Sequence, residues 1–368
     1  MDKLYNLYGS QGREMALEIL EEVPLELSSN MKVGIKPNLA LAKESQSGAT
    51  TDPELVAGVI EYLQAQGIED IIIIESSWVG DKTKRAFKVC GYEDLANQYG
   101  VRLYDLKDDS FQTYVSGDLE IKVCQKPLEV DYLINMPVLK AHCQTKITCA
   151  LKNLKGCIPD SEKRRFHTLD LHKPIAHLNQ ILRSDLIVVD GIIGDLTFEE
   201  GGNPVRMNRV LVGKDSVLID AFVAQLLGFD IDEIPYIKIA EELGLGSTDS
   251  TSAEIKYLNN SKDLIQEENK LVDTDINARK VERLAQYIVE KEACSACYGS
   301  LIHALQRIDD KYGLPKDTQV YIGQGWQEES ISGIGIGRCT GQAKDHISGC
   351  PPEAKRIVDK LIEIWGLD

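Results

Sequence analysis

Short runs of β-branched residues alternate with stretches of helical periodicity along residues 32–227. Four of these runs have the continuous apolar character of strands that are covered on both faces: 32–35, 70–75, 131–136 and 185–189. Helical periodicity is clearest in 53–66 and 216–227, where apolar residues recur every three or four positions. Because parallel strands need a crossover connection such as a helix, the pattern predicts an α/β fold with a mostly parallel sheet flanked by helices.

Polar and charged side chains gather where these predicted strands end. In open α/β sheets ligands bind at the carboxyl ends of the strands, so such residues are candidates for a ligand site. Six of them are predicted to bind the ligand: Lys36, Asn38, Thr148, Lys152, Asn153 and Asp190. Lys140 and His142 are the candidate catalytic acids, since an imidazole titrates near neutrality. The lysines concentrate positive charge in an otherwise acidic chain, which suits a small anionic ligand such as a phosphate or a carboxylate.

The same residues also have a simpler interpretation. Lys36 can lie in a surface turn, and the lysines of the segment 140–155 can form one solvated basic face of a helix. Thr148 and Lys152 stand four residues apart, so they share a face if this segment is helical.

Four cysteines near the end of the chain have the spacing of ligands to one inorganic centre. Cys294 and Cys297 form a CxxC pair, and Cys339 and Cys350 follow after a long gap. A CxxC pair can place two sulfurs on one metal centre, and proline often follows a cluster cysteine, as it does after Cys350. The glycine-rich stretch 332–339 frees backbone N–H groups that can donate hydrogen bonds to sulfur. We therefore expect these four cysteines to bind a 4Fe-4S cluster.

Two other interpretations of these cysteines remain open. Four thiolates also suit a structural zinc ion, which takes tetrahedral sulfur ligands. Unliganded thiols or a disulfide are the third possibility. Cys143, Cys149 and Cys157 lie near the basic segment, where each could be a further ligand, a nucleophile or a small buried hydrophobic residue.

The stretch from Gly335 to Pro352 resembles the cluster-binding sequence in the small electron-transferring subunits of respiratory complex I and nickel–iron hydrogenases. The shared features are Gly-x-Gly-x-Cys, which here ends at Cys339, and Gly-Cys-Pro-Pro around Cys350. The resemblance covers only this stretch. It therefore implies a ligand of a cubane cluster and says nothing about quinone or hydrogen chemistry.

Several segments of the α/β part resemble, in the same order along the chain, the bacterial and archaeal domain of unknown function family 362. They are Lys36-Pro37-Asn38, the segments 137–142 and 151–156 with Thr148 between them, Asp190-Gly191, and Asp215-Ser216-Val217 with Asp220. The resemblance covers roughly residues 32–230 and implies an accompanying iron–sulfur module without an assigned activity. The chain departs from the usual ferredoxin repeat because it has a single CxxC pair, so one cluster is implied. Its opening pattern is also distantly similar to the N-terminal α/β domain of the nickel-pincer lactate racemases.

Composition limits the partners and the compartment. The chain has 41 basic and 58 acidic residues, for a net charge of −17, which does not suit binding to nucleic acid or to an anionic membrane. With no signal-like N-terminus and no long apolar run, we expect a cytoplasmic protein. Polar composition around residues 246–275 predicts an α/β domain over 1–250 and a cluster-binding region over 251–368 that packs on it. A helix over 278–292 is expected to lead into the first cysteine pair.

Together these features predict a cytoplasmic 4Fe-4S redox enzyme that acts on a small anionic substrate. A rival hypothesis is a non-catalytic electron-transfer or partner-binding module, in which the α/β part docks onto a redox protein. The third is a structural zinc protein with non-redox chemistry. The enzyme, unlike the carrier, requires an enclosed site with convergent Lys and His side chains.

Overall fold

The computed structural model describes residues 3–196, 204–249, 253–259, 281, 283–316 and 318–367. The chain divides into two compact units. The first, which we call the α/β unit, consists of Met1–Lys163 and Leu171–Thr274; the second, the cysteine unit, consists of Arg164–Asp170 and Asp275–Asp368. Among the helices in the described ranges, none has the length and apolar character that crossing a bilayer requires.

An eight-stranded sheet forms the centre of the α/β unit, in the order β12-β1-β11-β10-β7-β2-β3-β4. Its strands in chain order are β1 (Lys3–Tyr8), β2 (Val33–Pro37), β3 (Ile71–Glu75), β4 (Arg102–Asp105), β7 (Tyr132–Met136), β10 (Leu186–Asp195), β11 (Pro204–Gly213) and β12 (Glu254–Tyr257). The strands from β10 to β4 in this order run parallel to one another, whereas β11 is antiparallel to both of its neighbours. The predicted α/β fold with a mostly parallel sheet is confirmed.

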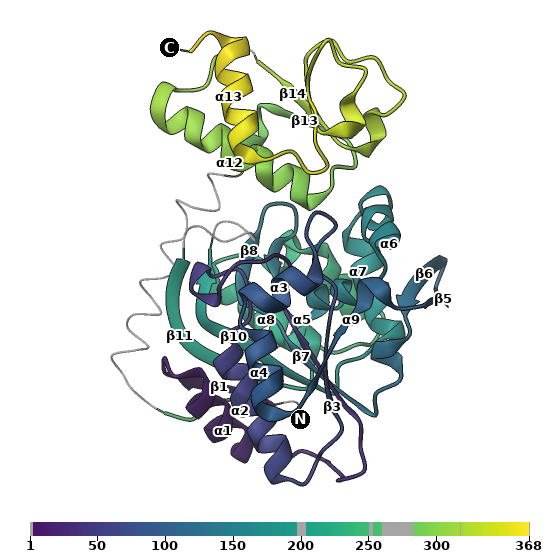
Figure 1. Ribbon diagram of the computed structural model, residues 1–368, viewed down its shortest axis with the longest axis vertical. Coiled ribbons are helices and arrows are strands. Elements are labelled where there is room, and N and C mark those ends of the chain that lie inside the picture. Colours follow the sequence, from purple (N-terminus) through teal and green to yellow (C-terminus); the bar gives the residue numbers. More distant parts are fainter. Residues whose placement is uncertain are drawn as a thin grey trace. The chain divides into compact units, whose positions relative to one another are not determined.

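Helices cover both faces of this sheet (Figure 1). On one face lie α1 (Gly12–Glu22), α2 (Pro53–Ala65), α3 (Thr83–Val89) and α4 (Tyr92–Tyr99). On the other face lie α5 (Ala150–Asn153), α7 (His172–Ile181), α8 (Ser216–Leu226) and α9 (Pro235–Glu242). The unit also contains the hairpins β5 (Phe111–Ser116) with β6 (Leu119–Cys124) and β8 (Lys140–His142) with β9 (Lys146–Thr148), and α6 (Asp160–Arg165) begins within it.

Helix α2 shows why these elements form where the sequence predicts them. The Asp52 side chain accepts a hydrogen bond from the Glu54 N–H and Pro53 occupies the first turn, so the helix has both a cap and a preset backbone angle at its start. Its apolar stripe is buried against the sheet residues Ile35 and Ile73. Burying one such side chain contributes about 1.5–3 kcal/mol, so packing fixes this helix more firmly than helix propensity does.

The order of the sheet reverses between β2 and β7. From β2 the chain continues outward on one side to β3 and β4, and then returns to the other side of β2 to form β7 and β10. Loops leave such a reversal in opposite directions, so ligands in open α/β sheets bind there, beyond the carboxyl ends of the strands. The fold therefore predicts a ligand site at the carboxyl ends of β2 and β7.

The cysteine unit contains a smaller, fully parallel sheet in the order β13-β14-β15-β16. Its elements are β13 (Ile288–Glu290), α12 (Ser295–Tyr312), β14 (Val320–Ile322), β15 (Ile334–Ile336), β16 (Asp345–Ile347) and α13 (Ala354–Trp365). The expected helix over 278–292 is wrong at its end, where Ile288 and Val289 are β-branched and pair in parallel with β14. Residues 278–280 and 282 of that prediction lie outside the described residues.

Candidate functional site

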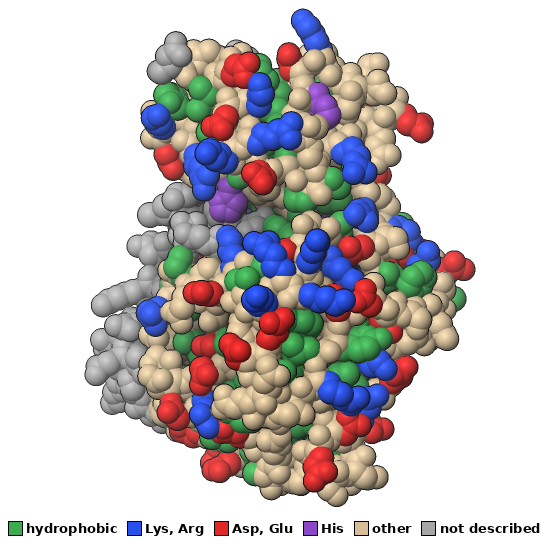
Figure 2. Space-filling view, in the orientation of Figure 1, with side chains coloured by type: hydrophobic (Ala, Val, Ile, Leu, Met, Phe, Trp, Pro, Cys, Tyr) green, Lys and Arg blue, Asp and Glu red, His purple; other side chains and the backbone are tan. Residues whose placement is uncertain are grey.

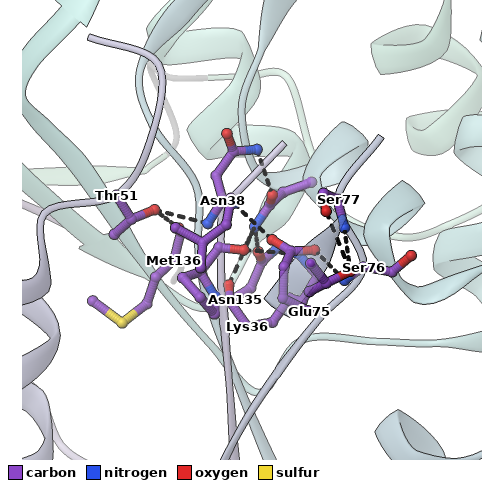
Figure 3. Close-up of polar contacts among 12 residues, drawn as sticks. Lys36, Asn38, Thr51, Glu75, Ser76, Ser77, Asn135 and Met136 are labelled. Atoms are coloured by element: carbon purple, nitrogen blue, oxygen red, sulfur yellow. Dashed lines mark hydrogen bonds and ion pairs between the residues drawn. The ribbon is translucent and has the colours of Figure 1, made fainter. Parts of the chain in front are cut away.

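Polar side chains from three neighbouring strands meet at the carboxyl end of the large sheet. Lys36 on β2 and Asn135 on β7 are register partners, and Glu75 is the last residue of β3, on the other side of β2. Figure 3 shows these side chains close to one another, beside Asn38 from the loop that follows β2. The parallel order of the strands thus gathers residues that are far apart in the sequence.

Lys36 and Glu75 form a buried ion pair. The Lys36 Nζ and Glu75 Oε1 atoms are 2.8 Å apart, and the two side chains are 1% and 2% exposed. The Glu75 carboxylate also accepts hydrogen bonds from the Leu39 and Ser76 N–H groups, at 2.7 and 2.6 Å. A Cβ atom on Gly156 would stand 2.6 Å from Glu75 Oε1 and 2.7 Å from Lys36 Nζ, so only glycine fits against the pair. Lys36, predicted to bind an anion, is thus neutralised by a carboxylate of the chain itself.

A directed chain of hydrogen bonds runs from Lys140 through three asparagine side chains. The Lys140 Nζ donates to Asn38 Oδ1 at 2.8 Å, and the Asn38 Nδ2 donates to Asn153 Oδ1 at 2.8 Å. The Asn153 Nδ2 donates to Asn135 Oδ1 at 2.7 Å, and the Asn135 Nδ2 donates to the Ala150 carbonyl at 2.9 Å. Every amide points the same way, so each bond polarises the next, and the ammonium group of Lys140 fixes all three orientations. We call this set the amide relay.

The remaining predicted ligand residues lie beside the relay in a different local structure. Thr148 ends β9 and pairs in register with Lys140 on β8, while Lys152 belongs to the short helix α5. They do not share a face of one helix, yet the Lys152 Nζ donates to Thr148 Oγ1 at 3.0 Å. The two side chains therefore meet because the chain passes from β9 into α5. The alternative expectation, one continuous helix through both residues, is wrong.

His142 is buried, and its ring accepts hydrogen bonds from the backbone of the turn that follows it. Its Nδ1 accepts hydrogen bonds from the Gln144 and Thr145 N–H groups, at 3.0 and 3.1 Å. Because Nδ1 is an acceptor, the proton of the neutral ring is on Nε2. Only Nε2 of this histidine is therefore placed to donate a proton to a ligand.

Asp190 belongs to β10, which neighbours β7 on the side away from β2 and β3. Its carboxylate accepts hydrogen bonds from the Asp52 N–H at 2.8 Å and from the Ile192 N–H at 3.1 Å. Burial raises the pKa of Asp190 to about 7, because the charged form loses its hydration. The neighbouring Thr51 accepts a hydrogen bond from the Asn38 N–H and donates one to the Met136 carbonyl, which ties the start of α2 to β7.

We expect Asp190→Asn to flatten the dependence of stability on pH. Folding raises the pKa of Asp190 from 3.8 to about 7, so the folded state binds the proton more tightly. The resulting stabilisation is complete below the unfolded pKa and is lost as the pH rises through the folded pKa, a change of at most about 4 kcal/mol. Urea unfolding of the wild type and the variant between about pH 5 and pH 8 measures how the free energy of unfolding depends on pH. If this free energy changed with pH equally in both proteins, Asp190 would not have a raised pKa in the folded state.

Two buried residues at this edge were not singled out from the sequence as site residues. The Lys163 Nζ donates to the carbonyl oxygens of Ser76 and Ser77 at 2.9 and 2.7 Å, and burial lowers the pKa of Lys163 to about 8. The Asp220 carboxylate accepts hydrogen bonds from the Ala150 and Leu151 N–H groups and so fastens the start of α5. No local spacing marks Lys163, because its partners follow a strand far away in the sequence.

Two exposed cations of α3 are paired with carboxylates. Figure 2 shows Lys and Arg side chains gathered over this helix. Lys84 is 74% exposed and pairs with Asp108, and Arg85 is 64% exposed and pairs with Asp81. A carboxylate thus stands beside each of these two cations, in a pair that is exposed to solvent and therefore weak.

In the cysteine unit, the CxxC pair begins a helix. Cys294 is the N-cap of α12 and Cys297 lies in its first turn, where the Cys297 N–H donates to the Cys294 carbonyl at 2.9 Å. The positive end of a helix stabilises nearby thiolates. The helix end thus favours the thiolate form of both cysteines, while burial opposes it and raises the pKa of Cys297.

Backbone pairing joins the segments that carry the other two cysteines. The Gly337 N–H donates to the Ile347 carbonyl at 2.9 Å, and the Arg338 N–H donates to the Gly349 carbonyl at 2.8 Å. A Cβ on Gly337 would stand 3.8 Å from Cys297 Sγ and 3.7 Å from the Gly349 carbonyl oxygen. Gly337 thus joins the CxxC helix to the segments that carry Cys339 and Cys350.

The four cysteines are close enough for their charges to affect the pKa of Cys297. Burial, followed by the charges of Cys294, Cys350 and Cys339, raises the pKa of the Cys297 thiol well above its ordinary value. The Gln327 Nε2 donates to Cys339 Sγ at 3.4 Å. No three His, Cys, Asp or Glu side chains in the described ranges stand around a common metal position, so the 4Fe-4S cluster stays a prediction.

Two of the other cysteines that the sequence left open are buried as hydrophobic residues are. Cys149 and Cys157 are fully buried, and burial raises the pKa of both thiols, that of Cys157 to about 12. A reactive cysteine needs a lowered pKa and access to solvent. These two are therefore packing residues, whereas Cys143 is half-buried.

Two known proteins are similar to parts of this chain. A thylakoid-associated protein of Synechocystis sp. is 25% identical over 253 residues, which cover 65% of this chain and 76% of that protein. The lactate racemase apoprotein from Thermoanaerobacterium thermosaccharolyticum is 12% identical with a TM-score of 0.40, over 60% of this chain and 56% of the racemase chain. The chain thus spans little more than half of the racemase, and a likeness this low carries no functional argument.

The family assignment rests on a longer match. Residues 33–225, more than half of the chain, match the model of a domain of unknown function, DUF362. The segments that indicated this family from the sequence, from Lys36-Pro37-Asn38 to Asp220, all lie within the match. The chain belongs to the DUF362 family.

Proposed function

We propose that this protein binds one 4Fe-4S cluster through Cys294, Cys297, Cys339 and Cys350 and uses it to transfer electrons. The observation that carries the proposal is the position of Gly337, which lies against both Cys297 Sγ and the Gly349 carbonyl. Cysteines that are far apart in the sequence thereby share one neighbourhood. Four thiolates are the ligand set of a cubane cluster, which supplies one-electron chemistry when bound.

The surroundings of the four thiols fit this group. The N-terminus of α12 provides a positive potential beside Cys294 and Cys297. The amide of Gln327 donates to Cys339 Sγ, and such hydrogen bonds to sulfur tune the potential of a cluster. Structural zinc remains the alternative, because it takes the same four thiolates.

We propose further that the α/β unit binds a small anionic substrate at the carboxyl edge of its sheet. Support comes from the amide relay, in which the buried Lys140 donates to Asn38 Oδ1 at 2.8 Å and to the Ala49 carbonyl at 2.6 Å. A phosphate or carboxylate would meet the Lys140 ammonium there, with Lys152 and the Nε2–H of His142 as further donors. Lys140 or His142 would supply the proton when the substrate is reduced.

Metal and sulfide analysis tests the cluster directly. We expect the anaerobically purified full chain to contain about four iron atoms and about four sulfides, as a cubane cluster requires. Reduction with dithionite should then give an electron paramagnetic resonance signal of a reduced cluster. One zinc per chain without sulfide would instead establish the structural metal, and a chain without metal would leave the thiols unliganded.

A further inference from the structure

We propose that the surface around Cys350 is the docking site of a small acidic redox protein. This inference rests on the proposed cluster and names the partner with which it exchanges electrons. Of the four cysteines, Cys350 is the exposed one, whereas Cys294, Cys297 and Cys339 are half-buried. Electrons leave a buried centre most readily where the least protein separates it from a partner, and here that point is Cys350.

Three exposed cations lie on segments next to that of this cysteine. Arg338 precedes Cys339, and its backbone N–H donates to the Gly349 carbonyl at 2.8 Å. Lys355 and Arg356 lie in the first turn of α13, and the Arg356 Nη2 donates to Ser348 Oγ at 3.0 Å. Arg338 and Arg356 are thus fastened to the two residues that precede Cys350. We call these three residues the Cys350 cation set.

Carboxylates of the chain do not neutralise this set. Among the described residues, Arg338, Lys355 and Arg356 form no ion pair, although the exposed Glu353 lies nearby in the sequence. Some other cations of the same unit are paired: Arg283 with Asp309, Lys291 with Glu329, and Lys360 with Glu363. The charges of Arg338, Lys355 and Arg356, in contrast, are not balanced by an ion pair among the described residues.

The position of Lys355 and Arg356 is also unfavourable for the helix itself. The first turn of a helix favours acidic side chains, because its unsatisfied N–H groups carry partial positive charge. The first turn of α13 contains no acidic residue. The N-cap residue Glu353 supplies one carboxylate at this helix end, and the two cations together with the helix dipole outweigh it.

Charge complementarity identifies the kind of partner. The chain as a whole carries −17, so a freely diffusing anion is repelled at long range. The Cys350 cation set reverses this repulsion at one place, and complementary charges fix the orientation of docking and raise the association rate. An acidic protein is thereby guided to the one surface from which transfer is short.

The salt dependence of electron transfer tests the proposal. The reduced full chain is mixed in a stopped-flow instrument with ferricyanide, an anionic oxidant, and with hexaamminecobalt(III), a cationic one. A plant-type ferredoxin serves as the acidic protein probe and donates electrons to the oxidised chain. Ionic strength is raised from about 10 mM to about 150 mM, over which the screening length falls from about 30 Å to about 8 Å.

We expect reactions with ferricyanide and ferredoxin to slow with salt, the protein reaction by about tenfold, and the cobalt reaction to show the opposite trend. The triple variant R338Q/K355Q/R356Q should remove the slowing, because only the net charge would then act. The control variant R283Q/K291Q/K360Q changes the net charge equally but removes paired cations, and it should behave as the wild type does.

Two results would overturn the docking site while leaving the cluster intact. One is ferricyanide oxidation that accelerates with salt in the wild type, and the other is an equal response of the two triple variants. Iron and sulfide are counted in the wild type and in every variant. If the wild type itself contained no cluster, the cluster proposal would fail; if the cluster were present, either of the two results above would overturn the docking site alone.

Discussion

Replacing Cys297 by alanine is expected to remove the iron and sulfide from the purified chain. Cys297 begins α12 together with Cys294, and its Sγ lies beside Gly337, which connects it to the segments of Cys339 and Cys350. Loss of one of the four thiolates weakens the binding of the cluster, so the iron content should fall well below about four atoms per chain. Iron and sulfide assays, together with the visible absorption of the cluster, measure the loss.

A matched substitution separates this effect from general damage. Cys124 is a buried thiol of the α/β unit whose Sγ contacts the Leu106 carbonyl, and burial raises its pKa to about 12. Cys124→Ala removes the same atom and should keep the full iron content. If Cys297→Ala also retained its iron and sulfide, the four cysteines would not be the ligands.

Glu75→Gln should be the most destabilising single substitution at the sheet edge. It keeps the shape of the side chain but leaves the Lys36 ammonium, 1% exposed, without its counter-charge. Removing one partner of a buried ion pair costs about 3–5 kcal/mol, mostly because the other charge remains buried. The midpoint of urea unfolding, followed by circular dichroism, gives the change in the free energy of unfolding.

The double variant Lys36→Met with Glu75→Gln tests the cause. If the isolated charge is responsible, removing Lys36 as well should recover most of the loss, since no buried ion remains. The exposed pair of Lys84 and Asp108 provides the control, and Asp108→Asn should cost less than about 1 kcal/mol. A loss below that value in Glu75→Gln would mean that the pair does not hold the edge together.

The sequence predicted the large sheet well because its central strands carry their own signal. Strands β2, β3, β7 and β10 are buried along their whole length, and each contains a run of mostly apolar residues. Strand β1 lacks such a run, and its antiparallel partner β11 is distant in the chain. The small sheet was missed for a related reason, since its strands have three residues each and show no periodicity.

The candidate site was predictable in its members but not in their pairing. Lys36, Asn38, Lys140 and Asn153 stand near strand ends, and parallel strands bring such ends to one edge. The ion pair with Glu75 depends on β3 being the neighbour of β2, which local patterns do not specify. The amide relay likewise depends on the side-chain geometry of three separate segments. The residue types therefore predict a polar site, but the net charge of that site can be known only once the fold shows which side chains pair.

The place of β1 in the large sheet has a consequence for synthesis on the ribosome. β1 lies between β11 and β12, which are residues Pro204–Gly213 and Glu254–Tyr257. At about 5–20 residues per second, roughly 10–40 s pass before either partner has been translated. During that interval its apolar residues, Leu4 and Leu7 among them, have no strand to pair with. The large sheet therefore cannot close around β1 until β11 and β12 have both been synthesised.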